Sequence, residues 1–326
     1  MKVLVTGATG FTGGHLARRL VDAGDVVRVL VRDPARLSPA LRDRVEAVVG
    51  DITSSADLAR AVAGCEVVYN IAALYREAGL PADAYGAVNA GAVVSIIEAA
   101  AAAGCRRVVH CSTVGVHGDI EHPPANEDAP LKPGDVYQET KLRGEALGRD
   151  AAARSGVELV IARPTGIYGP GDRRLFKMFG QIARGRFIMF GAGRNFYHVT
   201  YIDDLCDGFR LCATTPGAAG RTYILGGGEV TTLDALVAIT GEVAGVKRRP
   251  LRLPVWPVWL AGAACEMICA PLRIAPPLYR RRVDFFRKSR SFDISRARQE
   301  LGYAPKVGLR EGIRRTLEWY REHHWI

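Results

Sequence analysis

The chain has 326 residues, of which 48% are hydrophobic and 24% charged, as in ordinary globular proteins. This length can bury a large core and suits one large domain or two. The formal net charge of +10 favours an anionic ligand or surface. It does not indicate nucleic-acid binding, because no basic patch is interleaved with aromatic residues. The seven cysteines show no metal-ligand spacing, so we expect free thiols, no metal site and a cytoplasmic location.

The first predicted element is a buried strand over Val3–Val5, followed by a glycine-rich loop and a helix over residues 14–23. Glycine permits the tight turn of such a loop and lets its backbone approach a pyrophosphate closely. The N–H groups and the positive dipole end of the helix then face the phosphates. This context predicts a dinucleotide-binding loop. Its candidate binding residues are Gly7, Thr9, Gly10, Phe11 and Gly13.

Apolar runs alternate with helical segments up to about residue 165. Uninterrupted apolar strands are typical of a parallel sheet with helices on both faces. We therefore predict an α/β fold: a Rossmann-type doubly wound parallel sheet with a smaller, mixed C-terminal part. Residues 1–165 form the predicted dinucleotide-binding domain, to which a strand near 222–225 returns, and residues 166–326 are mainly the substrate-binding part. The predicted strands are 26–31, 45–49, 67–72, 107–112 and 158–162, and the predicted helices are 58–63, 89–103, 142–154 and 309–322.

Tyr137 and Lys141 are the strongest pair of catalytic candidates, because residues four apart share a face of a helix. A lysine ammonium beside a phenol favours the phenolate, which lets a tyrosine exchange protons near neutral pH. Ser112 and Thr113 lie at the carboxyl end of a predicted strand, where ligands bind in open α/β sheets. Either residue offers a hydroxyl that can hold a substrate oxygen.

Together these motifs resemble the extended short-chain dehydrogenase/reductase family, and the resemblance covers essentially the whole chain. That family includes NAD-dependent epimerases and dehydratases of nucleotide sugars, hydroxysteroid dehydrogenases, dihydroflavonol reductases and hopanoid-associated epimerase-like proteins. The residues that carry the resemblance are Thr6–Gly13, Gly50–Ile52, Asn70–Ala73, Asn89, Cys111–Thr113, Tyr137, Lys141, Arg163–Asp172, Ala297–Pro305 and Leu309–Gly312.

The resemblance implies a role for each matched position. Tyr137 would be the general acid/base, and Lys141 would hold the nicotinamide ribose. Counting back from Gly118 selects Thr113 as the hydroxyl donor, with Ser112 left open. A homodimer is implied by the resemblance alone. The remaining cofactor-binding positions are Asp51 and Ile52 beside the adenine, Ala72 and Ala73 in the cleft, Asn89, and Pro164 and Ile167 facing the nicotinamide.

The end of the 26–31 strand bears on the choice between NAD and NADP. Members specific for NAD place an acid there to hold the ribose hydroxyls. Here Val31 occupies that position and Arg32 follows, with Arg36 as a second cation. Arginines suit a 2′-phosphate, so the sequence favours NADP. Asp33 leaves NAD open, because its carboxylate can turn towards a ribose.

Five positions bear on the substrate. Nucleotide-sugar dehydratases of this family carry Asp-Glu after the catalytic threonine, whereas this chain has Val114 and Gly115, which argues against dehydration. Many nucleotide-sugar enzymes also carry an arginine for the substrate's phosphate where this chain has Tyr197. Arg194 lies close enough in sequence to replace it, and His198 is a further candidate for the substrate cleft.

Residues 251–278 are strongly apolar and contain two tryptophans, which favours a hydrophobic, sterol- or hopanoid-like substrate. Several prolines and charges argue against a membrane span. Two alternatives stay open for this stretch. It forms a lid helix over the site, or it contacts the inner face of a membrane peripherally, with Arg280–Arg282 and Arg287–Lys288 near anionic headgroups.

The sequence therefore predicts an NAD(P)-dependent oxidoreductase that interconverts a secondary alcohol and a ketone on a small hydrophobic molecule. Hydride transfer would be coupled to proton transfer by Tyr137. The alternative is a nucleotide-sugar 4-epimerase, which uses the same chemistry transiently. A non-catalytic dinucleotide sensor is disfavoured, because Thr113, Tyr137 and Lys141 are all present.

Overall fold

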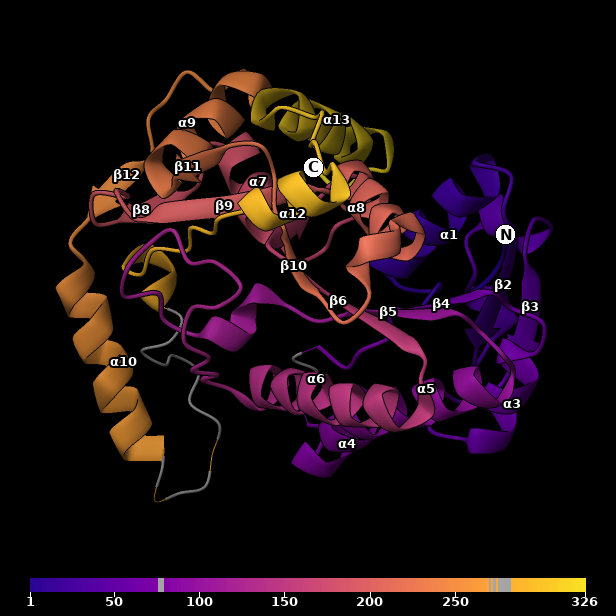
Figure 1. Cartoon of the computed structure of the whole chain (residues 1–326). Coiled ribbons are helices and arrows are strands. Elements are labelled where there is room, and N and C mark those ends of the chain that lie inside the picture. Colours follow the sequence, from indigo (N-terminus) through magenta and orange to yellow (C-terminus); the bar gives the residue numbers. More distant parts are fainter. Residues whose placement is uncertain (76–78, 270, 272–273, 275–282) are drawn as a thin grey trace.

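The computed structural model describes every residue except 76–78, 270, 272–273 and 275–282 (Figure 1). At its centre is a seven-stranded sheet with the order β10-β6-β5-β4-β1-β2-β3, in which all neighbouring strands are parallel. The order reverses between β1 and β4, which creates the crevice where such sheets bind ligands. The strands are β1 (Lys2–Thr6), β2 (Val26–Val31), β3 (Glu46–Val49), β4 (Val67–Asn70), β5 (Arg107–Cys111), β6 (Glu158–Pro164) and β10 (Thr222–Leu225).

Helices cover both faces of this sheet (Figure 1). On one face lie α1 (Phe11–Asp22) and α8 (Ile202–Thr214), and on the other α3 (Ser55–Val62), α5 (Ala92–Ala102) and α6 (Val136–Ser155). Strand β1 serves both layers, because Val3 and Val5 join one hydrophobic core and Leu4 joins the other. Each of these three side chains is fully buried. The predicted fold class is confirmed.

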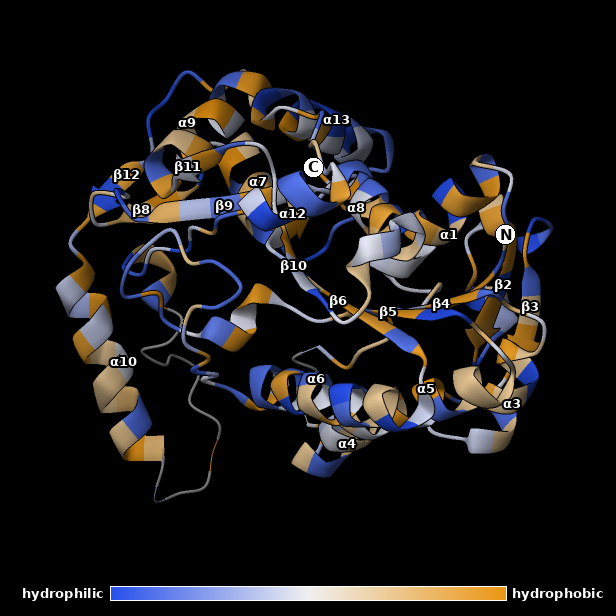
Figure 2. Ribbon diagram, in the orientation of Figure 1, coloured by the Kyte–Doolittle hydropathy of each residue, from blue (hydrophilic) through white to orange (hydrophobic). Residues whose placement is uncertain are grey.

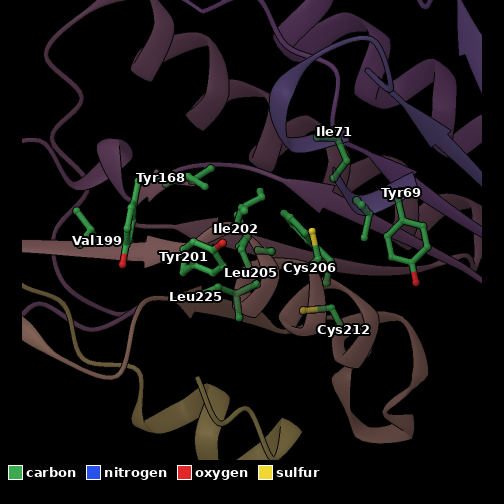
Figure 3. Close-up of a cluster of buried hydrophobic side chains, with 14 of the residues drawn as sticks. Tyr69, Ile71, Tyr168, Val199, Tyr201, Ile202, Leu205, Cys206, Cys212 and Leu225 are labelled. Atoms are coloured by element: carbon green, nitrogen blue, oxygen red, sulfur yellow. The ribbon is translucent and has the colours of Figure 1, made fainter. Parts of the chain in front are cut away.

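The second half of the chain is interleaved with the first. Strand β10 pairs with β6, and α8 packs against β5 and β6. Figure 3 shows side chains from β4, α8 and β10 meeting those of β7 (Gly166–Tyr168) and β9 (Phe196–Tyr201) in a single core. The predicted boundary between residues 165 and 166 divides the chain in sequence, and its role as a domain boundary stays a prediction.

The C-terminal part contains two small sheets and the remaining large helices. A three-stranded sheet has the order β11-β9-β7, and a parallel pair joins β12 to β8. A helix predicted over residues 309–322 is α13. The other elements here are β8 (Ile188–Phe190), β11 (Val230–Thr232), β12 (Leu251–Leu253), α7 (Phe176–Ala183), α9 (Leu233–Ala244) and α12 (Ser295–Leu301).

Two of the predicted helix starts lie at the site, and both are wrong. Helix α1 begins at Phe11 rather than at residue 14, because a glycine at position 13 lets its first turn approach the loop closely. Helix α6 begins at Val136 rather than at residue 142, because the carboxylate of Asp135 accepts the N–H of Gln138 at 2.7 Å and caps it. Helix α6 therefore includes both Tyr137 and Lys141.

One helical stretch of the described residues, Ala82–Ala102, is long and apolar enough to cross a membrane by length and composition. It combines α4 (Ala82–Gly86), a π-helical turn (Ala87–Gly91) and α5. Its α5 part packs against α3 and α6 on one face of the sheet. This packing gives it the place of a core helix.

Helix α10 (Val255–Cys269) projects from the side of the molecule (Figure 1). In Figure 2 most of its visible residues are hydrophobic, with pale and hydrophilic residues between them. Only Gly262 within it is buried, whereas Trp256 is 66% and Met267 72% exposed. No residue of α10 lines the cavity described below. The described part of the chain therefore does not show α10 as a lid over the site.

Candidate active site

A cavity of about 1490 Å³ opens at the carboxyl ends of β1, β2, β4, β5 and β6. These strand ends bring together residues that are far apart in sequence. Tyr197, from β9, lies in its wall with residues of the segment 284–292. The candidates that line the cavity are Gly7, Thr9, Gly10, Phe11, Gly13, Arg32, Arg36, Asp51, Ile52, Ala72, Ala73, Ser112, Thr113, Tyr137, Pro164, Ile167 and Tyr197.

The glycine loop is closed by tight backbone contacts. Gly7 has a φ of 74°, a left-handed conformation that favours glycine, and a Cβ there would lie 2.9 Å from the backbone of Ala72. A Cβ on Gly13 would lie 2.3 Å from the carbonyl oxygen of Gly7. The loop therefore leaves no room for side chains at these positions, and α1 starts directly behind it.

The hydroxyls of Ser112 and Thr113 have different surroundings. Ser112 is buried, and its Oγ donates to a carboxylate oxygen of Glu145 at 2.5 Å. Thr113 is only partly buried, and its Oγ1 accepts the N–H of Gly115 at 3.0 Å. No acceptor for the Thr113 hydroxyl proton is found among the described residues. Thr113 thus has a proton to offer in the cavity, whereas that of Ser112 is engaged.

Tyr137 and Lys141 lie one helical turn apart on α6. The Tyr137 ring lines the cavity and packs edge-on against Tyr75, with 4.8 Å between the ring centres. Lys141 is fully buried behind it, and its Nζ has no hydrogen-bond partner within the described part of the chain. Burial lowers the pKa of Lys141 from its ordinary value, while the nearby Cys111 and Glu145 act in the opposite direction.

Glu145 is the next residue on this face of α6, and it forms a buried ion pair with Arg163 at the end of β6. Arg163 Nε and Nη2 donate to the two carboxylate oxygens at 2.9 and 2.6 Å. Its Nη1 also donates to the carbonyl oxygen of Glu127 at 3.1 Å. The pair joins α6, β6 and the Ser112 hydroxyl, so it fixes the helix that carries Tyr137 against the strand end that carries Thr113.

Four candidates do not line the cavity. Lys141 is buried behind Tyr137, and the Asn89 side chain bonds to the backbone of Leu74 and to Thr140, which makes it part of the wall's support. His198 is buried, with its Nε2 2.9 Å from the carbonyl oxygen of Gly227. Arg194 is exposed on the turn before β9. The structure therefore brings neither Arg194 nor His198 to the substrate cleft.

Other residues line the cavity that the sequence reasoning did not assign to it. The side chain of Arg174 lies over the rings of Phe11 and Tyr75, with its Cζ 5.6 and 5.7 Å from the ring centres. Lys288, predicted to face lipid headgroups, instead pairs with Asp119 and with Asp284, the latter at 3.2 Å. Apart from the i,i+4 spacing of Asp284 and Lys288, no spacing in the sequence signals these contacts. The unassigned lining residues at the substrate end include Tyr75, Leu80, Tyr85, Lys132, Arg174, Asp284, Phe285, Lys288, Arg290 and Phe292.

This geometry is accompanied by a match to the family model described as the NAD dependent epimerase/dehydratase family, over residues 3–226. The chain belongs to this family. It is therefore an enzyme of the extended short-chain dehydrogenase type, whose members are NAD-dependent oxidoreductases and epimerases. The predicted family and enzyme class are confirmed.

Two relatives and one solved structure show the range of this epimerase/dehydratase family. A 2-alkyl-3-oxoalkanoate reductase of Stenotrophomonas maltophilia is 32% identical over 97% of this chain and 98% of its own. The 3beta-hydroxysteroid-dehydrogenase/decarboxylase isoform 1 of Arabidopsis thaliana is 30% identical over 97% of this chain and 78% of its own. The crystal structure of dTDP-glucose 4,6-dehydratase from Streptomyces venezuelae with NAD bound is 28% identical, with a TM-score of 0.79 and coverage of 100% of this chain and 98% of its own.

The residues of this family member fit a nicotinamide dinucleotide. Gly7 and Gly13 let the loop close tightly against the N-terminus of α1, where a pyrophosphate binds. The unpartnered ammonium of Lys141 costs free energy in its buried place until an acceptor reaches it, which the hydroxyls of a ribose would provide. A bound dinucleotide would place its pyrophosphate at the first of these features and its ribose hydroxyls at the second.

The ion pair between Glu145 and Arg163 yields a stability prediction. Glu145→Gln leaves the Arg163 guanidinium buried without its counter-charge, so we expect a loss of about 3–5 kcal/mol in the free energy of unfolding. Urea unfolding measures it. Glu139→Gln, an exposed change on the same helix, is the control and is expected to cost at most about 0.5 kcal/mol. Equal losses in the two variants would contradict the central role of the pair.

Proposed function

We propose that this enzyme is an NADP-dependent oxidoreductase that interconverts a secondary alcohol and a ketone on a hydrophobic, sterol- or hopanoid-like molecule. The observation that carries the proposal is the composition of the cavity. A glycine loop that fits a dinucleotide, the Thr113 and Tyr137 hydroxyls, and an aromatic wall that includes Phe285 and Phe292 line one continuous space. This arrangement supports transfer between a cofactor and an apolar substrate.

In the proposed reaction, each chain residue has a distinct task. Thr113 and Tyr137 hold the substrate oxygen by hydrogen bonds, and Tyr137 donates its proton to that oxygen during reduction. The Lys141 ammonium stabilises the resulting phenolate electrostatically. The bound nicotinamide supplies the hydride in this direction and accepts it in the other. Asp51, Ile52, Ala72 and Ala73, with Pro164 and Ile167, are proposed to line the cofactor, and Asn89 to support them from behind.

The preference for NADP rests on the residues after β2. Arg32 and Arg36 line the cavity. Asp33, the acid that would hold a ribose, instead caps the short helix Pro34–Arg36 by accepting the N–H of Ala35 at 2.9 Å. With this carboxylate engaged, Arg32 and Arg36 supply two positive charges at the adenosine end beside the single carboxylate of Asp51, which suits a 2′-phosphate.

The hydrophobic substrate is supported by the aromatic wall and by the relatives, which act on a hydroxysteroid and an alkyl-oxoalkanoate by their names. Directly after Thr113, Val114 and Gly115 line the cavity, so these two positions supply no acid for dehydration. The nucleotide-sugar epimerases among the solved structures are 22 and 23% identical and share the fold. The 4-epimerase alternative is therefore retained as an outcome of the activity test.

We further propose that α10 rests on an anionic membrane surface. A helix that is apolar all round belongs in a core or in lipid, and α10 is exposed. With 15 residues it is about 22 Å long, shorter than the roughly 30 Å of a bilayer's hydrocarbon, so it would lie in one leaflet. The exposed cations Lys247, Arg248, Arg249 and Arg252 precede it. Arg280–Arg282 lie outside the described residues.

The homodimer and the cytoplasmic location stay predictions.

Tyr137→Phe removes the proposed proton donor. We expect kcat for steroid ketones with NADPH to fall about a hundredfold to ten-thousandfold, with cofactor affinity nearly unchanged. Nicotinamide absorbance measures turnover, and quenching of tryptophan fluorescence measures cofactor binding. Undiminished turnover in the variant would contradict the assignment. Interconversion of UDP-sugars by the native enzyme without net absorbance change would establish the 4-epimerase alternative.

Arg32→Ala tests the cofactor preference. The native enzyme is expected to bind NADPH more tightly than NADH, and the variant to lose about tenfold or more of its NADPH affinity with little change for NADH. Titration calorimetry measures both dissociation constants. Arg44→Ala, which removes an arginine paired with Asp22, is the control and should leave them unchanged. A native preference for NADH would overturn the NADP proposal.

Trp256→Glu/Met267→Glu tests the membrane proposal. The native protein is expected to sediment with vesicles containing phosphatidylglycerol, less so with phosphatidylcholine alone and less so at high salt. The double variant should lose at least about tenfold in binding, because two charges enter the apolar phase. Val26→Glu, a change at a residue 57% exposed outside α10, is the control and should bind as the native protein does. Equal binding by native protein and double variant, or none by either, would reject the proposal.

A further inference from the structure

Among the described residues, the substrate end of the cavity holds four cations, and three of them have acidic partners. Lys132 pairs with Glu121 at 2.7 Å, Arg174 with Asp172 at 3.3 Å, and Lys288 with Asp119 and Asp284. Arg290 is different, since no carboxylate among the described residues lies within ion-pair distance of it. Its guanidinium is a charge that the described chain leaves unmatched.

Arg290 is held in place by its backbone. Its N–H donates to the carbonyl oxygen of Phe196 at 2.7 Å, and an isolated bridge pairs it with Tyr197. It is half-buried and close enough to Tyr197 to act on the pKa of that phenol, which burial raises and the Arg290 charge lowers. The guanidinium is therefore positioned beside the substrate wall rather than free in solvent.

The surroundings of Arg290 are aromatic. Phe285 packs edge-on against Tyr197, with 5.5 Å between ring centres, and Phe292 lines the same cavity and is 5% exposed. A cation next to apolar rings has lost part of its hydration, and an anionic ligand would compensate for that loss. The planar fork of a guanidinium matches a carboxylate, which it can bind by two parallel hydrogen bonds.

We propose that Arg290 binds a carboxylate carried by the hydrophobic substrate, so that the substrate is an apolar keto or hydroxy acid rather than a neutral sterol. This inference rests on the proposed function, because it concerns the substrate of the same site. A single unpaired guanidinium suits one carboxylate. A nucleotide diphosphate, with more charge, would need further cations, and the other three that the described residues place at this end are already paired.

Arg290 also bears on the position at which this sequence departs from its nucleotide-sugar relatives. Tyr197 stands where many nucleotide-sugar relatives carry an arginine, and Arg194 was the candidate to replace it. The structure places Arg194 on the surface and brings Arg290 beside Tyr197 from a segment about ninety residues further along the chain. The cation at this wall thus comes from a different part of the fold.

Titration calorimetry on the enzyme saturated with NADP⁺ tests this inference with two probe pairs. One pair is dehydrocholate, a steroid keto acid, and its methyl ester; the other is ricinoleate, a hydroxy fatty acid, and its methyl ester. In at least one pair the acid should bind native enzyme about tenfold or more tighter than the ester, since a charge-assisted pair contributes this much. Arg290→Gln should bring that ratio near one, and Arg290→Lys should restore part of it.

Arg287→Gln is the matched control, because Arg287 is exposed and does not line the cavity, and it should keep the native ratio. Unchanged NADPH affinity in every variant shows that the fold is intact. Equal binding of acid and ester in both pairs, or a preference that survives Arg290→Gln, overturns the inference. So does UDP binding that depends on Arg290 without any preference for the acids.

Turnover is measured separately, so that the two proposals fail in different ways. An Arg290-dependent preference for an acid, with no oxidation or reduction of any alcohol or ketone, would contradict the proposed reaction and keep the carboxylate site. Turnover of the esters as efficient as that of the acids would contradict the carboxylate site and keep the proposed reaction.

Discussion

The buried ion pair between Glu145 and Arg163 is the contact on which the arrangement of the site depends. It connects α6, which carries Tyr137 and Lys141, to the end of β6, and through the Ser112 hydroxyl to the end of β5. Broken, it would leave a charge buried without a partner, at a cost of several kcal/mol. Intact, it gives the helix one position relative to the strand ends. The proposed acid/base and hydroxyl donor therefore face the same cavity.

The distribution of charge along the cavity separates its two ends. At the adenosine end, Arg32 and Arg36 line the wall while Asp33 is engaged in a helix cap. At the substrate end, three of the four cations among the described residues pair with acids, and Arg290 lies in a wall that also holds aromatic rings. Two anionic groups, one on the cofactor and one on the substrate, would match these two places. The net charge of the chain does not by itself reveal either of these two places.

Helix α10 and the aromatic wall of the cavity are two separate apolar features, although the sequence suggests a single hydrophobic region. The structure divides them: the wall is built by residues before and after the apolar stretch, such as Tyr197 and Phe285, and no residue of α10 lines the cavity. A hydrophobic substrate and a lipid surface are thus supported by different residues. Each proposal can fail without the other.

Local patterns determined the dinucleotide loop, the parallel sheet, the helix over 309–322 and the Tyr137–Lys141 pair, because glycine spacing and hydrophobic periodicity act within a few residues. They predicted the start of α6 six residues late, since the Asp135 cap depends on one side chain. Only the tertiary structure decided that Ser112 is engaged by Glu145, that Arg194 and His198 miss the cleft, and that Arg290 reaches it. These contacts join segments that are distant along the chain. Their geometry follows from how the helices and strands pack, which no pattern of neighbouring residues encodes.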